Sequence, residues 1–225
     1  GAQPIERGLH RPGGKQKFGH TRNVTPIQAY REGLEVVRQA VRGGFLLGCG
    51  APLLPSIALV NGMRIGEDTA PFWNSNLAPF QGVNALYALK NSIMRYFMHK
   101  RWWLNDPDCL LLRSKDIELT ANEKELYALV AGTLDNMIIE SDDLELVDDW
   151  GKELLRRAIG LRGGKVHVKG LLGDGPFLID SAGGPAGAIR LAATLSAAPK
   201  ILESRQIPGR TGVFLDDVLI QGALL

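Results

Sequence analysis

The sequence contains few of the residues that build disulfide frameworks, metal centres and membrane spans. Its 225 residues include two cysteines, Cys49 and Cys109, and four histidines. Two cysteines cannot form a disulfide framework, and the histidines are scattered without the spacing of zinc or iron ligands. No apolar run reaches the roughly 18 residues that a transmembrane helix needs. We therefore expect no metal, no organic cofactor and no membrane-spanning segment.

Positive and negative charges nearly balance in the sequence. Lys and Arg number 26 and Asp and Glu number 24, which gives a formal net charge of +2. Such a balance offers no general attraction for nucleic acid or for an anionic membrane, so neither is expected as a partner. Hydrophobic residues make up 45% and charged residues 22%, as in a folded globular chain. The basic, glycine-rich segment 1–22 is interpreted as a solvated loop.

Helix and strand patterns alternate from residue 25 to residue 160. Thr25, Pro26 and Gln28 have the arrangement of a capping box with proline in the first turn, and Thr120 with Glu123 forms a second capping box. Apolar residues at steps of three and four, and short apolar runs between them, predict the elements. The expected helices run from 25 to the Gly43–Gly44 pair, over 82–98, from 120 to about 134 and over 147–160, and the expected strands are 45–49, 62–66, 101–106 and 137–141. The strand at 45–49 is expected to be buried on both faces.

This alternation predicts an α/β fold with a parallel sheet. Past Gly163 the pattern changes to short runs separated by glycine and proline, which predicts a small antiparallel, sandwich-like β domain over 164–225. The α/β part, residues 1–163, provides four strands, whereas a (β/α)₈ barrel has eight. It is therefore either a small open sheet or half of a barrel, and the pattern alone leaves both open.

Polar residues gather where the predicted strands end. Cys49 and Gly50 follow the first strand, and an Asn-Asp-Pro-Asp run at 105–108 follows the third. Ligands of parallel α/β proteins bind at the carboxyl ends of the strands, so these residues are site candidates. The structural alternatives are stronger from the pattern alone. Both cysteines stand among apolar residues, which favours buried, inert thiols, and the run at 105–108 favours a turn.

Arg64 and Asp68, at the end of the second strand, are spaced so that both side chains lie on the same face of an extended chain. The spacing by itself suits a structural salt bridge. The alternative is a catalytic pair, because a carboxyl beside Phe72 and Trp73 would have its pKa raised by desolvation and would donate a proton near neutral pH. Arginine would offer paired donors to a substrate hydroxyl.

Four long segments of the chain resemble a known family. They are GCGAPLLPS at 48–56, GMRIGEDTAPFW at 62–73, RYFMHKRWWLNDPDCLLLR at 95–113 and LDNMIIESDDL at 134–144. In order and spacing they are similar to the melibiases, the bacterial α-galactosidases of glycoside hydrolase family 36, from about Asn23 to Gly163. The resemblance implies the C-terminal half of a (β/α)₈ barrel followed by the small β domain. It also implies hydrolysis of terminal α-linked galactose from galactosides and oligosaccharides with retention of configuration.

The resemblance assigns roles to individual residues. Asp68 matches the acid/base carboxyl, which first protonates the leaving oxygen and then activates water. Arg64 matches the arginine that binds a sugar hydroxyl close to the reacting carbon. The other substrate-binding positions are the Cys49–Gly50 step that lines the galactose pocket, Trp73, and Asp108 at the pocket wall.

The chain also departs from the family pattern. The family's nucleophile is an aspartate in a Lys-hydrophobic-Asp strand, shortly before a segment similar to the GAQP that begins this sequence. The nucleophile is therefore expected upstream of Gly1. Glu67 stands where relatives usually carry proline, and the basic loop at 6–22 is longer. The expectation is a C-terminal fragment that carries the acid/base half of the site and is inactive alone.

Two other functions stay open at this point. The same scaffold could act on a related α-linked or arabinopyranosidic sugar. A non-catalytic sugar-binding or assembly subunit is the other alternative, which the intact Asp68 disfavours. A cytoplasmic location is expected, with export left open, and the sequence does not determine the oligomeric state.

Overall fold

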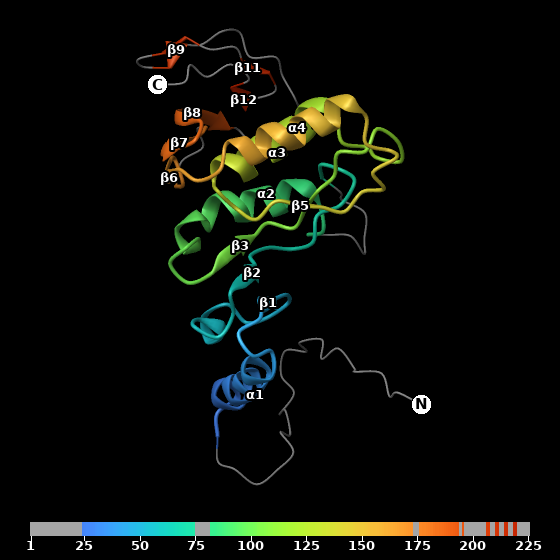
Figure 1. The fold of residues 1–225 in the computed structure, drawn as a ribbon. Helices are drawn as coiled ribbons and strands as arrows, with labels where there is room; N and C mark the ends of the chain where they lie inside the picture. Colours follow the sequence, from blue (N-terminus) through green and yellow to red (C-terminus); the bar gives the residue numbers. More distant parts are fainter. Residues whose placement is uncertain are drawn as a thin grey trace.

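The computed structural model describes residues 24–74, 82–172, 176–193 and 195, together with the backbone of four two-residue strands near the C-terminus. Figure 1 shows α1 at one end of the chain, followed by short strands that lead to a layer of helices and an antiparallel sheet. The α/β fold with parallel strands that the alternation predicts is confirmed.

The helices begin where their caps predict. α1 (Pro26–Ala40) and α3 (Ala121–Thr133) both start with complete capping boxes, from Thr25 with Gln28 and from Thr120 with Glu123. The side chains of Asn84 and Asp148 cap the other two α-helices. Asn84 precedes α2 (Ala85–Met94), and Asp148 precedes α4 (Asp149–Gly160). The described residues also include two short 3₁₀ helices, η1 (Leu54–Ser56) and η2 (Tyr96–Met98).

The parallel strands are two or three residues long. β1 (Leu47–Gly48), β2 (Gly62–Arg64) and β3 (Leu104–Asp106) form one sheet in that order, with Arg64 in register with Asp106. β4 (Cys109–Leu110) follows β3 after two residues and pairs in parallel with β5 (Ile139–Glu140). The segment 104–110 therefore contacts β2 through its first half and β5 through its second, so the strands lie side by side in the order of the sequence.

The pairing past Gly163 is antiparallel, as the pattern there predicts. β6 (Lys165–Lys169), β7 (Phe177–Gly184) and β8 (Gly187–Ala193) form successive antiparallel pairs. The short strands β12 (Val218–Leu219) and β11 (Phe214–Leu215) continue this sheet, and β9 (Gln206–Ile207) pairs with β10 (Arg210–Thr211). The main core crosses the expected boundary at 163/164, since buried residues of α2, α3 and α4 pack with Val168, Ile179 and Leu191. The division into two domains stays a prediction.

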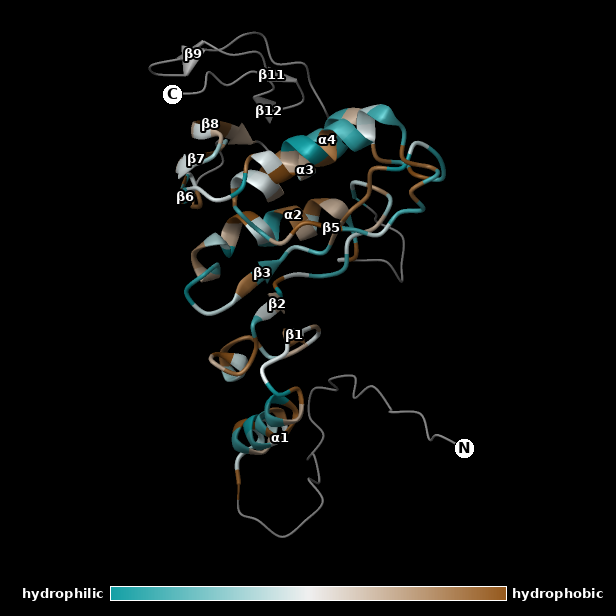
Figure 2. Cartoon of the chain, in the orientation of Figure 1, coloured by the Kyte–Doolittle hydropathy of each residue, from teal (hydrophilic) through white to brown (hydrophobic). Residues whose placement is uncertain are grey.

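The expected burial of the strand at 45–49 on both faces is wrong. Phe45 is 56% exposed and Leu47 38% exposed, because β1 is the edge strand of its sheet. Figure 2 shows hydrophobic residues on α1 and β1, and no residue of α1 is buried. Among the residues that the structure describes, no helix is both long and apolar enough to cross a membrane.

His99 supports the strand that carries Asp106. Its Nδ1 accepts the backbone N–H of Asn105 at 3.0 Å, and its side chain is 7% exposed. A protonated Nδ1 could not accept that bond. The pKa of His99 is lowered to about 4, mainly by burial and also by the charges of Lys100 and Arg162, which together outweigh the opposing effect of Asp135.

This pKa predicts a loss of stability in mild acid. Between pH 6.5 and 4 the unfolded chain binds a proton at His99 that the folded chain does not, so the free energy of unfolding falls as the pH falls. We expect a loss of about 1–3 kcal/mol from this group over that window. Urea unfolding at several pH values should show a shallower fall for His99→Gln, whereas His167→Gln, at an exposed position of β6, should leave the slope unchanged. Equal slopes in all three proteins would contradict the prediction.

Candidate active site

Arg64, the last residue of β2, lies among three carboxylates. Its Nε donates to Asp106 Oδ2 at 3.1 Å, its Nη2 lies 2.9 Å from Asp108 Oδ1, and its Nη1 donates to Asp68 Oδ1 at 2.9 Å. Burial alone would lower the pKa of Arg64, but the negative charges of Asp106 and Asp108 outweigh it and raise that pKa. The guanidinium stays charged and is held in one orientation by the directions of its donors.

The three carboxylates differ sharply in exposure. The side chain of Asp106 is 0% exposed and that of Asp108 10%, whereas that of Asp68 is 71% exposed. The prediction that Arg64 and Asp68 share a face is confirmed by their contact. The expected desolvation of the Asp68 carboxyl beside Phe72 and Trp73 is wrong, because β2 ends at Arg64, the chain bends at residues 66 and 67, and Asp68 is exposed after the bend.

The run at 105–108 forms the turn that its sequence favours. Asp106 Oδ1 accepts the backbone N–H of Asp108 at 2.8 Å, which is an Asx turn. Asp108 adopts a positive φ of 78°. Below the turn, the hydroxyl of Tyr127 on α3 donates to the carbonyl oxygen of Pro107 at 2.8 Å. The turn is therefore anchored both to itself and to the helix layer.

Both cysteines are more exposed than the apolar sequence around them predicts, Cys49 more so than Cys109. Cys49 is exposed, so its expected burial is wrong; it follows the edge strand β1 and lies near Arg64. Gly50 beside it has a φ of +64°, which favours glycine. Cys109 is half-buried, its Sγ donates to Asp108 Oδ1 at 3.2 Å, and burial raises the pKa of its thiol.

The structure brings Arg64, Asp68 and Asp108 into one cluster, with Cys49 nearby. Trp73 packs half-buried against the main core, and its role in substrate binding stays a prediction. Asp106 belongs to the candidate run at 105–108, but the sequence assigns it no role of its own, and Tyr127 is not among the site candidates. The register of β2 against β3 places Asp106 beside Arg64, and Tyr127 follows the apolar pattern of a core residue.

The acidic run at 140–143 does not form a cation site. Asp142 Oδ1 bonds Arg113 Nη1 at 2.7 Å, and its Oδ2 accepts the backbone N–H of Arg113 at 2.8 Å. Burial raises the pKa of the neighbouring Glu140 to about 7. Within the described ranges, no group of three or more His, Cys, Asp or Glu side chains is arranged to hold a metal ion.

Comparisons with known proteins point to one class of enzyme. No protein-family model matches the chain. The α-galactosidase from Thermus thermophilus, solved in complex with p-nitrophenyl α-D-galactopyranoside, is similar with a TM-score of 0.55 and 27% identity, over 68% of this chain and 32% of that one. The α-galactosidase I from Mortierella vinacea has a TM-score of 0.60 at 13% identity, over 78% of this chain and 49% of that one.

A third α-galactosidase, from Saccharomyces cerevisiae with raffinose, has a TM-score of 0.57 at 10% identity, over 78% of this chain and 46% of that one. The likenesses below 25% identity concern the fold alone. The chain spans about a third to a half of the length of these α-galactosidases. In structure it is similar to part of each of them.

The hydrogen bond from Tyr127 to Pro107 predicts that removing the Tyr127 hydroxyl lowers the stability of the fold. Tyr127→Phe leaves the buried carbonyl of Pro107 without this donor, so the free energy of unfolding should fall by about 1–3 kcal/mol. Tyr87→Phe, at a tyrosine that is 41% exposed, should change it by less than about 0.5 kcal/mol. Denaturant unfolding of the two variants tests this, and equal stabilities would show that the contact contributes nothing.

Proposed function

We propose that this chain carries the acid/base half of a retaining glycosidase that removes terminal α-linked galactose from galactosides and oligosaccharides. The observation that carries the proposal is the pair of Arg64 and Asp68 at the carboxyl end of β2, in a chain similar to α-galactosidases. The long motifs that resemble glycoside hydrolase family 36 contain both residues and add independent support.

We further propose that residues 1–163 form the C-terminal half of a (β/α)₈ barrel and that 164–225 form a small β domain. The parallel strands lie in the order of the sequence, as in a barrel, whereas an open doubly wound sheet changes direction at a switch point. β1 is an edge strand, and Phe45 and Leu47 are exposed there. In a complete barrel the next strand would pair with this edge. The partial coverage of the α-galactosidase chains supports the same proposal.

In this mechanism Asp68 protonates the glycosidic oxygen as it leaves and then takes a proton from the attacking water. Its carboxyl is exposed enough to meet a substrate. The ion pair with Arg64 is also exposed on the Asp68 side, so parting it costs only about 0–1 kcal/mol. Arg64 Nη1 then becomes a donor for a sugar hydroxyl. Three further positions, Cys49, Gly50 and Trp73, are proposed to contact the sugar, and the nucleophile is proposed to lie upstream of Gly1.

Asp68→Ala tests the acid/base role in an active protein that contains this chain. With p-nitrophenyl α-galactoside the leaving group needs little protonation, so the loss falls on hydrolysis of the covalent intermediate, and kcat should fall about 10²–10⁴-fold. Azide, which needs no general base, should restore turnover and give α-galactosyl azide. Glu67→Ala, at the exposed neighbour of Asp68, should stay within about twofold. Unchanged turnover in Asp68→Ala, or no rescue by azide, would refute the assignment.

The 225-residue chain alone should not release p-nitrophenol from this substrate, because a retaining mechanism needs a second carboxylate as nucleophile. The measurement is p-nitrophenol release by the purified chain, with an active α-galactosidase as positive control. If the chain alone turns over the substrate, and Asp68→Asn abolishes this turnover, the nucleophile does not lie upstream of Gly1. The galactosidase assignment would then remain intact.

A further inference from the structure

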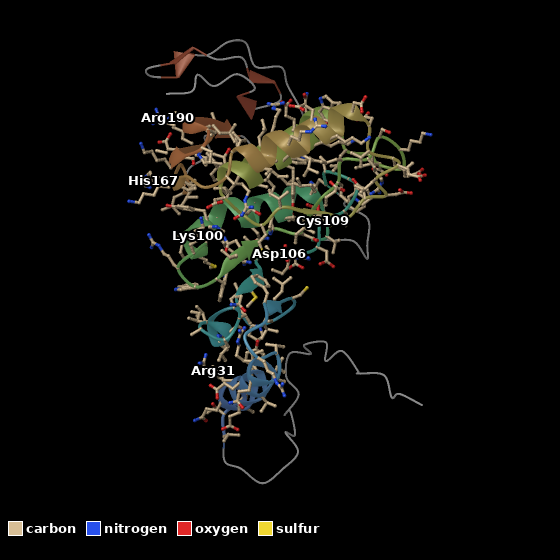
Figure 3. The ribbon with its side chains drawn as sticks, in the orientation of Figure 1. Arg31, Lys100, Asp106, Cys109, His167 and Arg190 are labelled. Carbon is tan, nitrogen blue, oxygen red and sulfur yellow. The ribbon has the colours of Figure 1, made fainter. Side chains whose placement is uncertain are left out.

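The carboxylate of Asp108 contacts donors of three residues. Oδ2 accepts the backbone N–H of Thr69 at 2.8 Å. Oδ1 accepts the backbone N–H of Cys109 at 2.8 Å and its thiol at 3.2 Å, and it lies 2.9 Å from Arg64 Nη2. In Figure 3, Asp106 and Cys109, on either side of this residue in the sequence, lie near the middle of the chain below the helix layer.

These contacts leave Asp108 little capacity for a substrate. A carboxylate oxygen has about two lone-pair sites. Oδ1 already contacts three donors, so a sugar hydroxyl could bond it only by displacing one of them, which costs the desolvation of that donor. Oδ2 accepts the Thr69 N–H, and the side chain that carries both oxygens is only 10% exposed, which limits the access of a sugar.

The same contacts join both members of the proposed catalytic pair. Oδ1 holds the guanidinium of Arg64, and Oδ2 holds the main chain at Thr69, the residue directly after Asp68. A movement of Asp108 would therefore shift the arginine and the bend that carries Asp68 relative to each other. Asp68 itself contacts Arg64 through an exposed ion pair, which is too weak to fix the two in place.

The backbone of Asp108 is also in an unfavourable conformation. Its φ of 78° lies in the left-handed region, which costs a residue with a Cβ of the order of 1 kcal/mol or more. Such a conformation persists only where surrounding bonds determine it. The bond from its own N–H to Asp106 Oδ1, the three hydrogen bonds to its carboxylate and the ion pair with Arg64 are those determinants.

We propose that Asp108 is a positioning residue, which ties Arg64 to Thr69 and so holds Arg64 and Asp68 at their working separation, and that it is not a ligand of the sugar. The inference rests on the proposed roles of Arg64 and Asp68. It replaces the pocket-wall contact that the family resemblance implies for Asp108.

Asp108→Asn tests the proposal by NMR on the 225-residue chain. The asparagine oxygen should stay on the side of Arg64 and the Cys109 N–H, which both need an acceptor. The NH₂ group then faces the Thr69 N–H and that tie is lost, while the loss of the negative charge weakens the tie to Arg64. Hydrogen exchange at the Thr69 amide should become at least about tenfold faster, while the amide of buried Val130 on α3 changes less. The two Nη resonances of Arg64, distinct while the guanidinium is clamped, should merge as it rotates.

Asp68→Asn is the matched control, since it makes the same chemical change at the exposed partner of Arg64 and next to Thr69. Exchange at Thr69 should stay within about twofold in this variant. Equal acceleration at Thr69 and Val130 in Asp108→Asn would show a general loss of stability and overturn the proposal, as would unchanged Thr69 exchange. If Asp108→Asn does not fold, Asp108→Glu is measured in the same way. Failure of both to fold while Asp68→Asn folds would also count against a local role.

These signals do not need turnover. If Thr69 and Arg64 respond as expected but Asp68→Ala leaves the turnover of an active protein that contains this chain unchanged, the proposed function is refuted and the tie is kept. If Asp68→Ala loses turnover and azide restores it, but Thr69 and Arg64 do not respond, the tie is refuted and the proposed function is kept.

Discussion

The charge of Arg64 organises this part of the molecule. An arginine that is 15% exposed is stable only if its charge is paired and its N–H groups are bonded. Asp106 and Asp108 meet that requirement from the adjacent strand and the turn after it, and their oxygens are in turn bonded by backbone N–H groups of Asp108, Cys109 and Thr69. The bend after β2 and the turn after β3 therefore behave as one unit. Breaking any bond in it leaves a buried charge less compensated.

The strands themselves contribute little to this rigidity. β1, β2, β3, β4 and β5 have two or three residues each, so their ladders contain few hydrogen bonds. Side chains fix the geometry in their place. Tyr127 holds Pro107 from α3, His99 accepts the N–H of Asn105, and the Asn105 side chain bonds Trp103 Nε1 and the carbonyl of Arg95. Support for the site thus comes from segments before and after it in the sequence.

The features that the sequence predicts well are those set by neighbours along the chain. Thr25 with Gln28 and Thr120 with Glu123 cap their helices because a capping box needs only four consecutive residues. The spacing of Arg64 and Asp68 predicts their proximity, although the chain bends at residues 66 and 67 and does not stay extended between them. Exposure does not follow from local pattern. Cys49 and the strand at 45–49 stand among apolar residues, yet they lie exposed at a sheet edge, because their burial depends on what packs against that edge. The bond from Tyr127 to Pro107 spans 20 residues and has no local signal.

The three aspartates around Arg64 are chemically identical, so their different roles come from their surroundings. Asp106 and Asp108 are buried, and their oxygens accept backbone N–H groups and contact Arg64. Asp68 is exposed, shares one arginine N–H and can part from it cheaply. Arginine suits this arrangement because its planar fork directs Nε and Nη2 to two fixed carboxylates and leaves Nη1 for a third. A lysine ammonium on one flexible stem could not address three carboxylates in defined directions. Two buried partners and one exposed partner leave Nη1 beside an exposed carboxyl, an arrangement that fits the acid/base role proposed for Asp68.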